Sequence, residues 1–177
     1  MNIKSDRLTI RRIQADDWQD IKEIWMDQKA SAYGKYDQTN DTEDPAVQSR
    51  IAKWASCSDS SEHMFFAVCL NKEVIGFFAF NSRTAWGEPA YEIGYAFKSA
   101  YSGHGYAGES LDALLDYVRA HYLVRRFTAG TALANTPSVD LLLSSGFMRI
   151  GTEQVSFYKD EQGKGINFTG GIYELAF

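Results

Sequence analysis

The heptapeptide SGHGYAG, from Ser102 to Gly108, is the stretch of this chain whose residue types and spacing most directly suggest chemistry. Gly103, Gly105 and Gly108 form the pattern G-x-G-x-x-G, in which glycines let a backbone approach a pyrophosphate at the N-terminus of a helix. Three interpretations follow: a dinucleotide-binding turn, a different phosphate-binding loop, or a tight turn that needs glycine only for its backbone conformation.

The dinucleotide interpretation makes three demands on the surrounding sequence. A strand should end at the first glycine, a helix should open directly after the motif, and an acid should follow about 20 residues later. Only the helix is expected, because residues 98–102 separate the preceding strand from Gly103 and the later segment RRFTAG has no carboxylate. A Walker A loop is excluded because no Gly-Lys-Ser/Thr follows. The physics of phosphate binding survives, since the amides of residues 103–108 lead into a helix whose N-terminus favours an anion.

The elements that must position this loop follow from the spacing of apolar residues. Helical spacing predicts helices that begin after Asp16 or Asp17, after Thr42, at Tyr106 and at Pro137, with Thr136 as the N-cap of the last one. Apolar alternation and apolar runs predict strands over residues 7–13, 63–70, 73–81, 89–97, 125–133, 147–159 and 165–177. The order predicts an α/β (α+β) chain with a mixed sheet of about seven strands, in a single domain spanning residues 1–177.

Composition and charge narrow the classes of protein. The formal net charge of −5 argues against broad nucleic-acid binding and against adhesion to an anionic membrane. Cys57 and Cys69 form no C-x-x-C pair and the three histidines are scattered, so no metal site is expected. The chain opens without an apolar signal segment and has no apolar run of about 18 residues, which predicts a cytoplasmic protein.

With its surroundings, the glycine stretch becomes more specific. The segment YEIGYAFKSAYSGHGYAGESLDALLDYV resembles the core of the GNAT N-acetyltransferase superfamily, whose pattern is Gln/Arg-x-x-Gly-x-Gly/Ala between a strand and a long helix. Gly105 and Ala107 match the last two positions of that pattern. Ser102 stands where the family has Gln or Arg, a departure that removes one polar phosphate contact but leaves the amides.

Two further segments extend the resemblance over nearly the whole chain. TALANTPSVDLLLSSGF is similar to the next family signature through Asn135, Ser138, Gly146 and Phe147. SDRLTIRRIQADDWQDI is similar to the first strand and helix of the family. The EIGY and RLTIRRI strands most resemble the branch that includes ribosomal-protein N-terminal acetyltransferases and several antibiotic-modifying enzymes.

The resemblance implies a GNAT fold, with helices on both faces of a mostly antiparallel sheet and two splayed strands that form a cleft for coenzyme A. Acetyl-CoA is then the donor, and a backbone N–H near Ala96–Phe97 bonds the thioester carbonyl as an oxyanion donor. Asn135 and Ser138 are expected across the cleft, near the thioester and the pantetheine. The pyrophosphate is expected on the loop formed by Ser102, Gly103, His104, Gly105, Tyr106, Ala107 and Gly108.

Direct transfer also needs a base that accepts a proton from the amine and a group that stabilises or protonates the leaving thiolate. Glu92 is the candidate base, although it can equally be a solvated or paired strand residue. Many relatives carry a Tyr seven positions after the Asn, which protonates the leaving thiolate. This chain has Leu142 at that position, so either Ser138 hydrogen-bonds the sulfur or CoA leaves as a thiolate. Both residues also have a purely structural interpretation: Asn135 as a turn residue at the end of a strand, and Ser138 as an ordinary hydroxyl on a helix.

The acceptor is expected beside Tyr33 and Tyr36, in an irregular segment whose neighbouring acids suit a cationic amine: Asp37, Asp41, Glu43 and Asp44. The sequence therefore predicts an N-acetyltransferase acting on a protein N-terminus or a small-molecule amine. The alternative is a catalytically silent CoA-binding sensor or interaction module. A homodimer is a further option, because the strand INFTGGIYELAF either pairs across a dimer or lies at the sheet edge.

Overall fold

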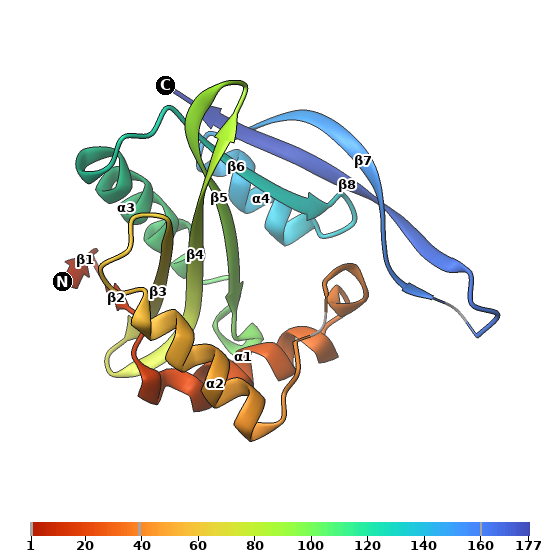
Figure 1. Cartoon of the computed structure of the whole chain (residues 1–177), viewed down its shortest axis with the longest axis horizontal. Coiled ribbons are helices and arrows are strands. Elements are labelled where there is room, and N and C mark those ends of the chain that lie inside the picture. Colours follow the sequence, from red (N-terminus) through yellow and green to blue (C-terminus); the bar gives the residue numbers. More distant parts are fainter. Residues whose placement is uncertain (1, 39, 160) are drawn as a thin grey trace.

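A sheet of eight strands organises the computed structural model, which describes residues 2–38, 40–159 and 161–177 (Figure 1). The strands lie in the order β1-β2-β3-β4-β5-β6-β8-β7. Their bounds are β1 Asn2–Lys4, β2 Leu8–Arg12, β3 His63–Leu70, β4 Glu73–Ala85, β5 Glu88–Phe97, β6 Arg126–Ala132, β7 Met148–Lys159 and β8 Gly165–Ala176. The mostly antiparallel mixed sheet predicted from the sequence is confirmed, with one strand more than expected, because the short β1 pairs with β2.

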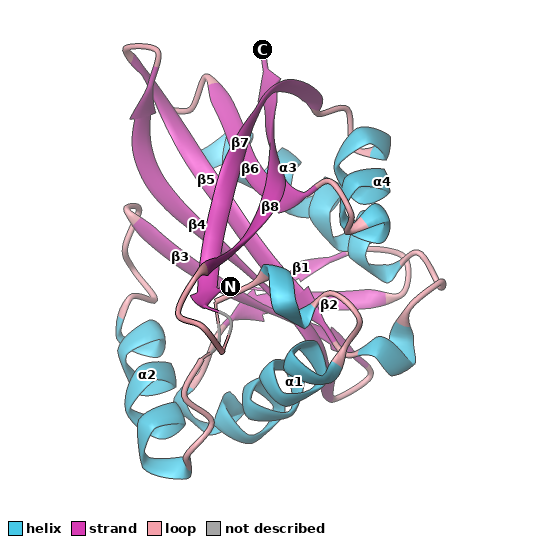
Figure 2. Cartoon of the chain, turned by 90° about the vertical axis from the view of Figure 1, so that its right-hand side faces the viewer, coloured by secondary structure: helices cyan, strands magenta, loops and turns pink. Residues whose placement is uncertain are grey.

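Helices cover both faces of this sheet, as Figure 2 shows. α1 (Trp18–Ala30) and α2 (Asp44–Ser56) pack on one face, and α3 (Tyr106–His121) and α4 (Thr136–Ser144) pack on the other. The short 3-10 helices are η1 (Ala15–Asp17), η2 (Gly34–Tyr36) and η3 (Ser99–Tyr101). Within the described residues, none of the helices is both long enough and apolar enough to cross a membrane.

Two buried cores hold these layers together. The larger core lies under α3 and α4, where Leu111, Leu114 and Val118 share a helical stripe and meet the aromatic side chains of the central strands. The smaller core lies under α1 and α2 and includes Trp25 and Ile51. Because side chains alternate across a strand, β3 and β4 contribute to both cores.

β5 and β6 form the only parallel pair among the described strands, and they stay together briefly. Their register covers Ala90↔Arg126, Tyr91↔Phe127 and Glu92↔Thr128. Beyond that point β5 remains paired with β4 as far as Phe97, while β6 remains paired with β8 as far as Ala132. The two strands therefore diverge and leave an opening in the middle of the sheet, which Figure 1 shows between β5 and β6.

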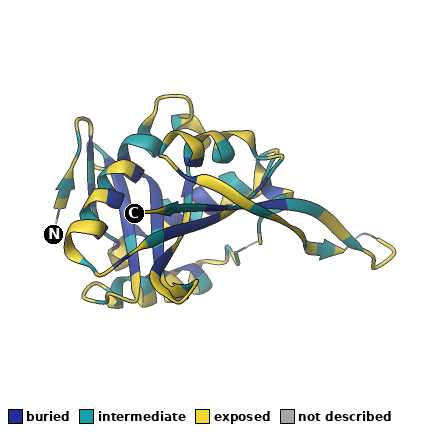
Figure 3. Ribbon diagram, turned by 90° about the horizontal axis from the view of Figure 1, so that it is seen from above, coloured by how far each residue is buried: buried dark blue, intermediate teal, exposed yellow. Residues whose placement is uncertain are grey.

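β7 and β8 form a long hairpin whose far end extends beyond the body of the molecule (Figure 3). β8 lies between β6 and β7, so the expectation that this last strand lies at the sheet edge was wrong, and β7 is the edge at this end of the sheet. The reason is burial: β8 brings Gly170, Gly171 and Tyr173 into the core, whereas β7 is exposed along most of its length. Pairing across a dimer stays a prediction.

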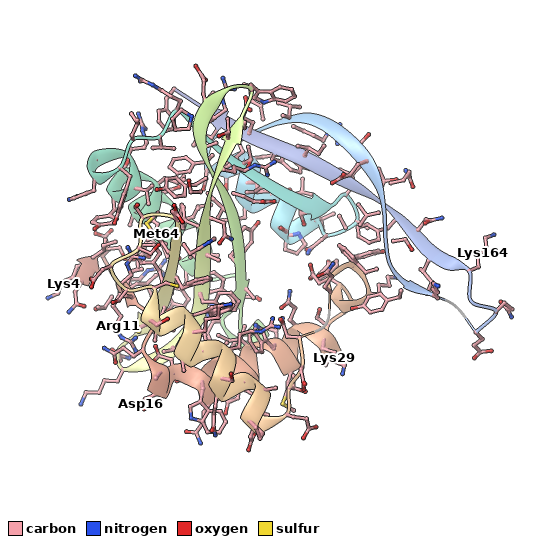
Figure 4. The ribbon with its side chains drawn as sticks, viewed as in Figure 1. Lys4, Arg11, Asp16, Lys29, Met64 and Lys164 are labelled. Carbon is pink, nitrogen blue, oxygen red and sulfur yellow. The ribbon has the colours of Figure 1, made fainter. Side chains whose placement is uncertain are left out.

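An ion pair fixes the turn between β2 and α1. The guanidinium of Arg11, labelled in Figure 4, donates from both terminal nitrogens to the Asp17 carboxylate, at 2.7 Å each. Asp17 is 6% exposed, and it also accepts a hydrogen bond from the Gln14 N–H at 2.8 Å. The carboxylate thus closes the turn that begins α1.

We expect Asp17→Ala to lower the free energy of unfolding by about 3 kcal/mol, because it leaves the Arg11 guanidinium without its counter-ion at a mostly buried site. Urea denaturation measures this change. The matched control is Asp16→Ala, which removes an exposed carboxylate from the same turn and should change stability by no more than about 0.5 kcal/mol. Equal effects of the two variants would contradict the assignment.

Candidate active site

The opening between β5 and β6 presents main-chain groups that no neighbouring strand uses. Two hydrogen bonds fix the alternation along β5: Lys98 N–H donates to Ile75 C=O on the β4 side, and Pro89 C=O accepts from Arg125 N–H on the β6 side. Because successive residues of a strand point their main-chain groups in opposite directions, the groups of Tyr95 and Phe97 face the opening. The N–H expected near Ala96–Phe97 is therefore that of Phe97, since the alternation directs the main-chain groups of Ala96, like those of Lys98, toward β4.

The opposite wall of the opening is the end of β6. Leu133 N–H donates to Thr169 C=O of β8, so the alternate residues Gly130 and Ala132 direct their main-chain groups toward β5. The sheet thus has two facing rows of unpaired donors and acceptors. An extended ligand with amides of its own can hydrogen-bond to both rows.

The loop from Ser102 to Gly108 lies at the end of β5 and leads into α3. Gly103 and Gly105 have φ of 76° and 79°, left-handed values that side chains disfavour. Glu109 N–H donates to Gly105 C=O, which starts the helix ladder and leaves the three preceding amides without helical partners. As predicted from the sequence, Gly103 belongs to the loop and Gly108 is already inside the helix.

His104, an exposed side chain of this loop, hydrogen-bonds the Ser102 carbonyl through Nδ1 at 2.8 Å and stacks on Tyr106. A cation lies next to the same turn. The Arg7 guanidinium sits 4.5 Å from the centre of the Tyr106 ring and pairs with Glu109 at 2.7 Å.

Glu109 fastens the N-terminal strands to the start of α3. Its carboxylate accepts hydrogen bonds from Ser5 Oγ at 2.6 Å and from Arg7 N–H at 2.8 Å. Burial opposes ionisation of Glu109, but the hydrogen bonds from Ser5 and Arg7 outweigh burial and lower its pKa. The carboxylate therefore stays charged and keeps Arg7 at the loop.

Asn135 and Ser138 lie at the end of β6, on the far side of the opening. Asn135 is the N-cap of α4, and its side-chain oxygen accepts from Ser138 N–H at 3.4 Å, which is the turn role named as its alternative. Ser138 Oγ is 2.7 Å from the hydroxyl of Tyr95, so this pair bridges α4 and β5. Burial raises the pKa of Tyr95 to about 12, and its hydroxyl remains protonated at neutral pH. Leu142 is fully buried and carries no proton donor.

Glu92 occupies the last position at which β5 and β6 are paired. Its side chain is exposed on the face covered by α1 and α2, and it pairs with Arg83 at 3.1 Å. Glu92 is thus a paired strand residue in this structure, and its carboxylate would have to separate from Arg83 to reach an amine.

A groove of about 450 Å³ lies beside the opening, between η2, the end of β6 and β8. Tyr36 lines it and meets Phe168 edge to face at 5.2 Å, whereas Tyr33 is not among its lining residues. The volume is within the range of small-ligand sites, about 300–1,000 Å³. The lining residues are Lys35, Tyr36, Leu133, Ala134, Ile166, Asn167, Phe168 and Thr169.

Two groups of this region escaped prediction as site residues from the sequence. Tyr95 shares a strand face with the apolar residues Ile93 and Phe97, and this spacing gives no sign that its hydroxyl has a partner. Arg7 is distant in sequence from the glycine loop, and only the fold brings the two together. In the part of the chain that the structure describes, no group of three or more His, Cys, Asp or Glu side chains is arranged to hold a metal ion.

Comparison with known proteins agrees with this geometry. The acetyltransferase (GNAT) domain family matches residues 7–148, and the chain belongs to this family. The chain is 29% identical over 153 residues to the uncharacterized N-acetyltransferase YnaD of Bacillus subtilis. This match covers 85% of each protein.

Solved structures share the fold. A GNAT-family acetyltransferase from Bacillus anthracis superposes with a TM-score of 0.76 at 26% identity, over 99% of this chain and 98% of that one. The ribosomal L7/L12 alpha-N-protein acetyltransferase RimL, in complex with coenzyme A, has a TM-score of 0.80 at 16% identity, over 100% of this chain and 98% of that one. The fold, with its splayed strands, is therefore that of acetyltransferases for which coenzyme A is the expected ligand.

We expect Gly105→Ala to weaken coenzyme A binding about tenfold, the cost of one charged hydrogen bond, because a Cβ at φ +79° displaces the amides at the start of α3. Titration calorimetry with coenzyme A measures the change. Gly87→Ala is the matched control, since Gly87 has the same φ of 79°, an added Cβ there meets nothing within 4 Å, and it lies in the β4–β5 turn. Similar losses in both variants would show that strain alone is responsible.

Proposed function

We propose that this protein transfers the acetyl group of acetyl-CoA directly to a primary amine. The observation that carries the proposal is the opening between β5 and β6, with unpaired main-chain groups along both walls and a glycine loop at its end. Membership of the GNAT family supports the same reaction class.

In this proposal the pyrophosphate accepts hydrogen bonds from the amides of Tyr106, Ala107 and Gly108, where the helix dipole favours negative charge. Arg7, whose guanidinium lies over the Tyr106 ring, and Ser102, at the start of the loop, are proposed to contact the same ligand. The pantetheine arm follows β5, and the Phe97 N–H donates to the thioester oxygen, where charge develops as the amine attacks.

The reaction then needs few groups. A neutral amine nitrogen bonds the acetyl carbon, the carbon–sulfur bond breaks, and its electron pair leaves on sulfur. The proton lost by nitrogen balances the thiolate. Ser138, hydrogen-bonded to Tyr95, is the group proposed to donate to the leaving sulfur in place of the Tyr that Leu142 replaces. Glu92 is proposed to accept the amine proton, directly or through water.

The acceptor enters by the groove lined by Tyr36 and Phe168, which is open enough for either a protein N-terminus or a small-molecule amine. A second candidate function is a CoA-binding module without catalysis. The buried Leu142 favours it, because no phenol stands at that position to protonate the thiolate.

Incubation of the protein with acetyl-CoA and a panel of amines, with free thiol as the readout, tests the proposal. The panel contains polyamines, aminoglycosides and peptides with free N-termini. We expect turnover with at least one class. Tight coenzyme A binding without turnover across the panel would favour the silent module, and an absence of coenzyme A binding would contradict both.

For an accepted amine, we expect Ser138→Ala to lower kcat about tenfold or more while leaving the affinity for coenzyme A nearly unchanged, because the lost hydroxyl acts on the leaving group. Steady-state kinetics and calorimetry separate the two effects. Ser144→Ala, which removes an exposed hydroxyl from the other end of α4, is the control. A normal kcat for Ser138→Ala would remove Ser138 from the mechanism.

A further inference from the structure

Asp37 follows η2 and is held in place by its main chain. Its N–H donates to Gly34 C=O at 3.3 Å, and its C=O accepts from the hydroxyl of Tyr158 on β7. The segment after α1 is therefore tied to the β7–β8 hairpin on the far side of the groove. These bonds fix where the Asp37 carboxylate can reach.

Only one of the two carboxylate oxygens of Asp37 accepts a hydrogen bond from the described residues. Oδ2 accepts from Gln28 Nε2 at 2.9 Å, and within the described residues no hydrogen bond reaches Oδ1. The nearby cations Lys29 at the end of α1, labelled in Figure 4, and Lys35 in η2 make no ion pair with it. Asp44, in the same acidic part of the sequence, instead pairs with Lys22.

Burial makes this arrangement costly. The pKa of Asp37 is raised because its half-buried carboxylate is partly withdrawn from water, and the bond from Gln28 offsets only part of that effect. A carboxylate in such surroundings gains from a cation that donates to its free oxygen, because a buried charge is expensive unless it is paired.

Asp37 itself lines a small space of about 10 Å³ with Gln28, Lys29 and Gly34, and its chain neighbour Tyr36 lines the groove. Its own negative charge is close enough to Tyr95 to contribute to the raised pKa of that side chain, and the Tyr95 hydroxyl contacts Ser138. An amine held at Asp37 would thus lie near the groups proposed to surround the thioester.

We propose that Asp37 binds the ammonium group of the acceptor, through Oδ1, and so selects cationic primary amines over neutral analogues. This inference rests on the proposed function, since it assigns the residue that recognises the acceptor. Asp37 makes this contact in the bound state before the nitrogen loses its proton to a base. The cationic group supplies the counter-charge that the described residues of the chain do not.

The test compares Asp37→Asn with wild type on an amine that wild type acetylates. Asn preserves the shape of the side chain and can still accept from Gln28, so only the charge is removed. We expect the KM for the amine to rise at least about tenfold, the scale of one charged hydrogen bond, with unchanged affinity for coenzyme A. Asp44→Asn is the matched control: it removes the same charge from the start of α2, where Asp44 pairs with Lys22, and should leave KM unaltered.

A second measurement separates recognition of charge from loss of shape. The alcohol analogue of the amine, in which hydroxyl replaces ammonium, serves as a competitive inhibitor of both proteins. Wild type should bind the amine more tightly than the alcohol, and Asp37→Asn should lose that preference. A structural role would weaken both ligands equally.

The outcomes distinguish this inference from the proposed function. Wild-type turnover with an unchanged KM in Asp37→Asn overturns the role of Asp37 and leaves the acetyltransferase assignment standing. A preference for the amine over the alcohol that survives in Asp37→Asn has the same meaning. If wild type turns over no amine, the proposed function has failed, and calorimetric titration of the coenzyme A complex with the amine and the alcohol still tests Asp37: equal binding to wild type and Asp37→Asn overturns its role.

Discussion

The short pairing between β5 and β6 is the constraint on which the rest of the molecule depends. Three residue pairs join the strands, and each strand then follows its other neighbour. If the pairing continued to Phe97, the main-chain groups that face the opening would be consumed by the sheet. Because it stops at Glu92, one strand delivers the glycine loop and α3, while the other delivers Asn135 and α4 to the opposite wall.

Packing on both faces maintains this divergence. The core under α3 and α4 holds the inner side chains of β5, and the core under α1 and α2 receives Ala96 from the same strand. At the far end of β5, the Phe97 ring lies over Gly76, where a Cβ would stand 2.2 Å from a ring carbon. The absence of a side chain at Gly76 makes room for the Phe97 ring, so β5 can stay paired with β4 as far as Phe97.

The elements were largely predictable from the sequence, since apolar periodicity is a local property. The helix at Tyr106 and the hairpin turn at Asn71–Lys72 are confirmed. β4 extends four residues past the predicted end. The prediction stopped short because residues 82–84 are exposed and pair with β5 without an apolar pattern in the sequence. The glycine loop was identifiable because its residues are contiguous. Arg7 and Tyr95 were not identified, since their surroundings come from segments distant in the chain. Asp37 was predicted only as one of four acids beside the acceptor, because neither the burial nor the partners of a carboxylate are encoded locally.

The two rows of unpaired main-chain groups also have a consequence for the lifetime of the protein. A ligand that fills the opening completes the sheet much as an inserted strand would, and it binds the native chain but not the unfolded one. At a hundred times its dissociation constant, such a ligand adds about 2.7 kcal/mol to the stability of the fold. Resistance to proteolysis would then vary with the supply of that ligand, and the steady amount of the protein would follow the metabolic state that sets this supply.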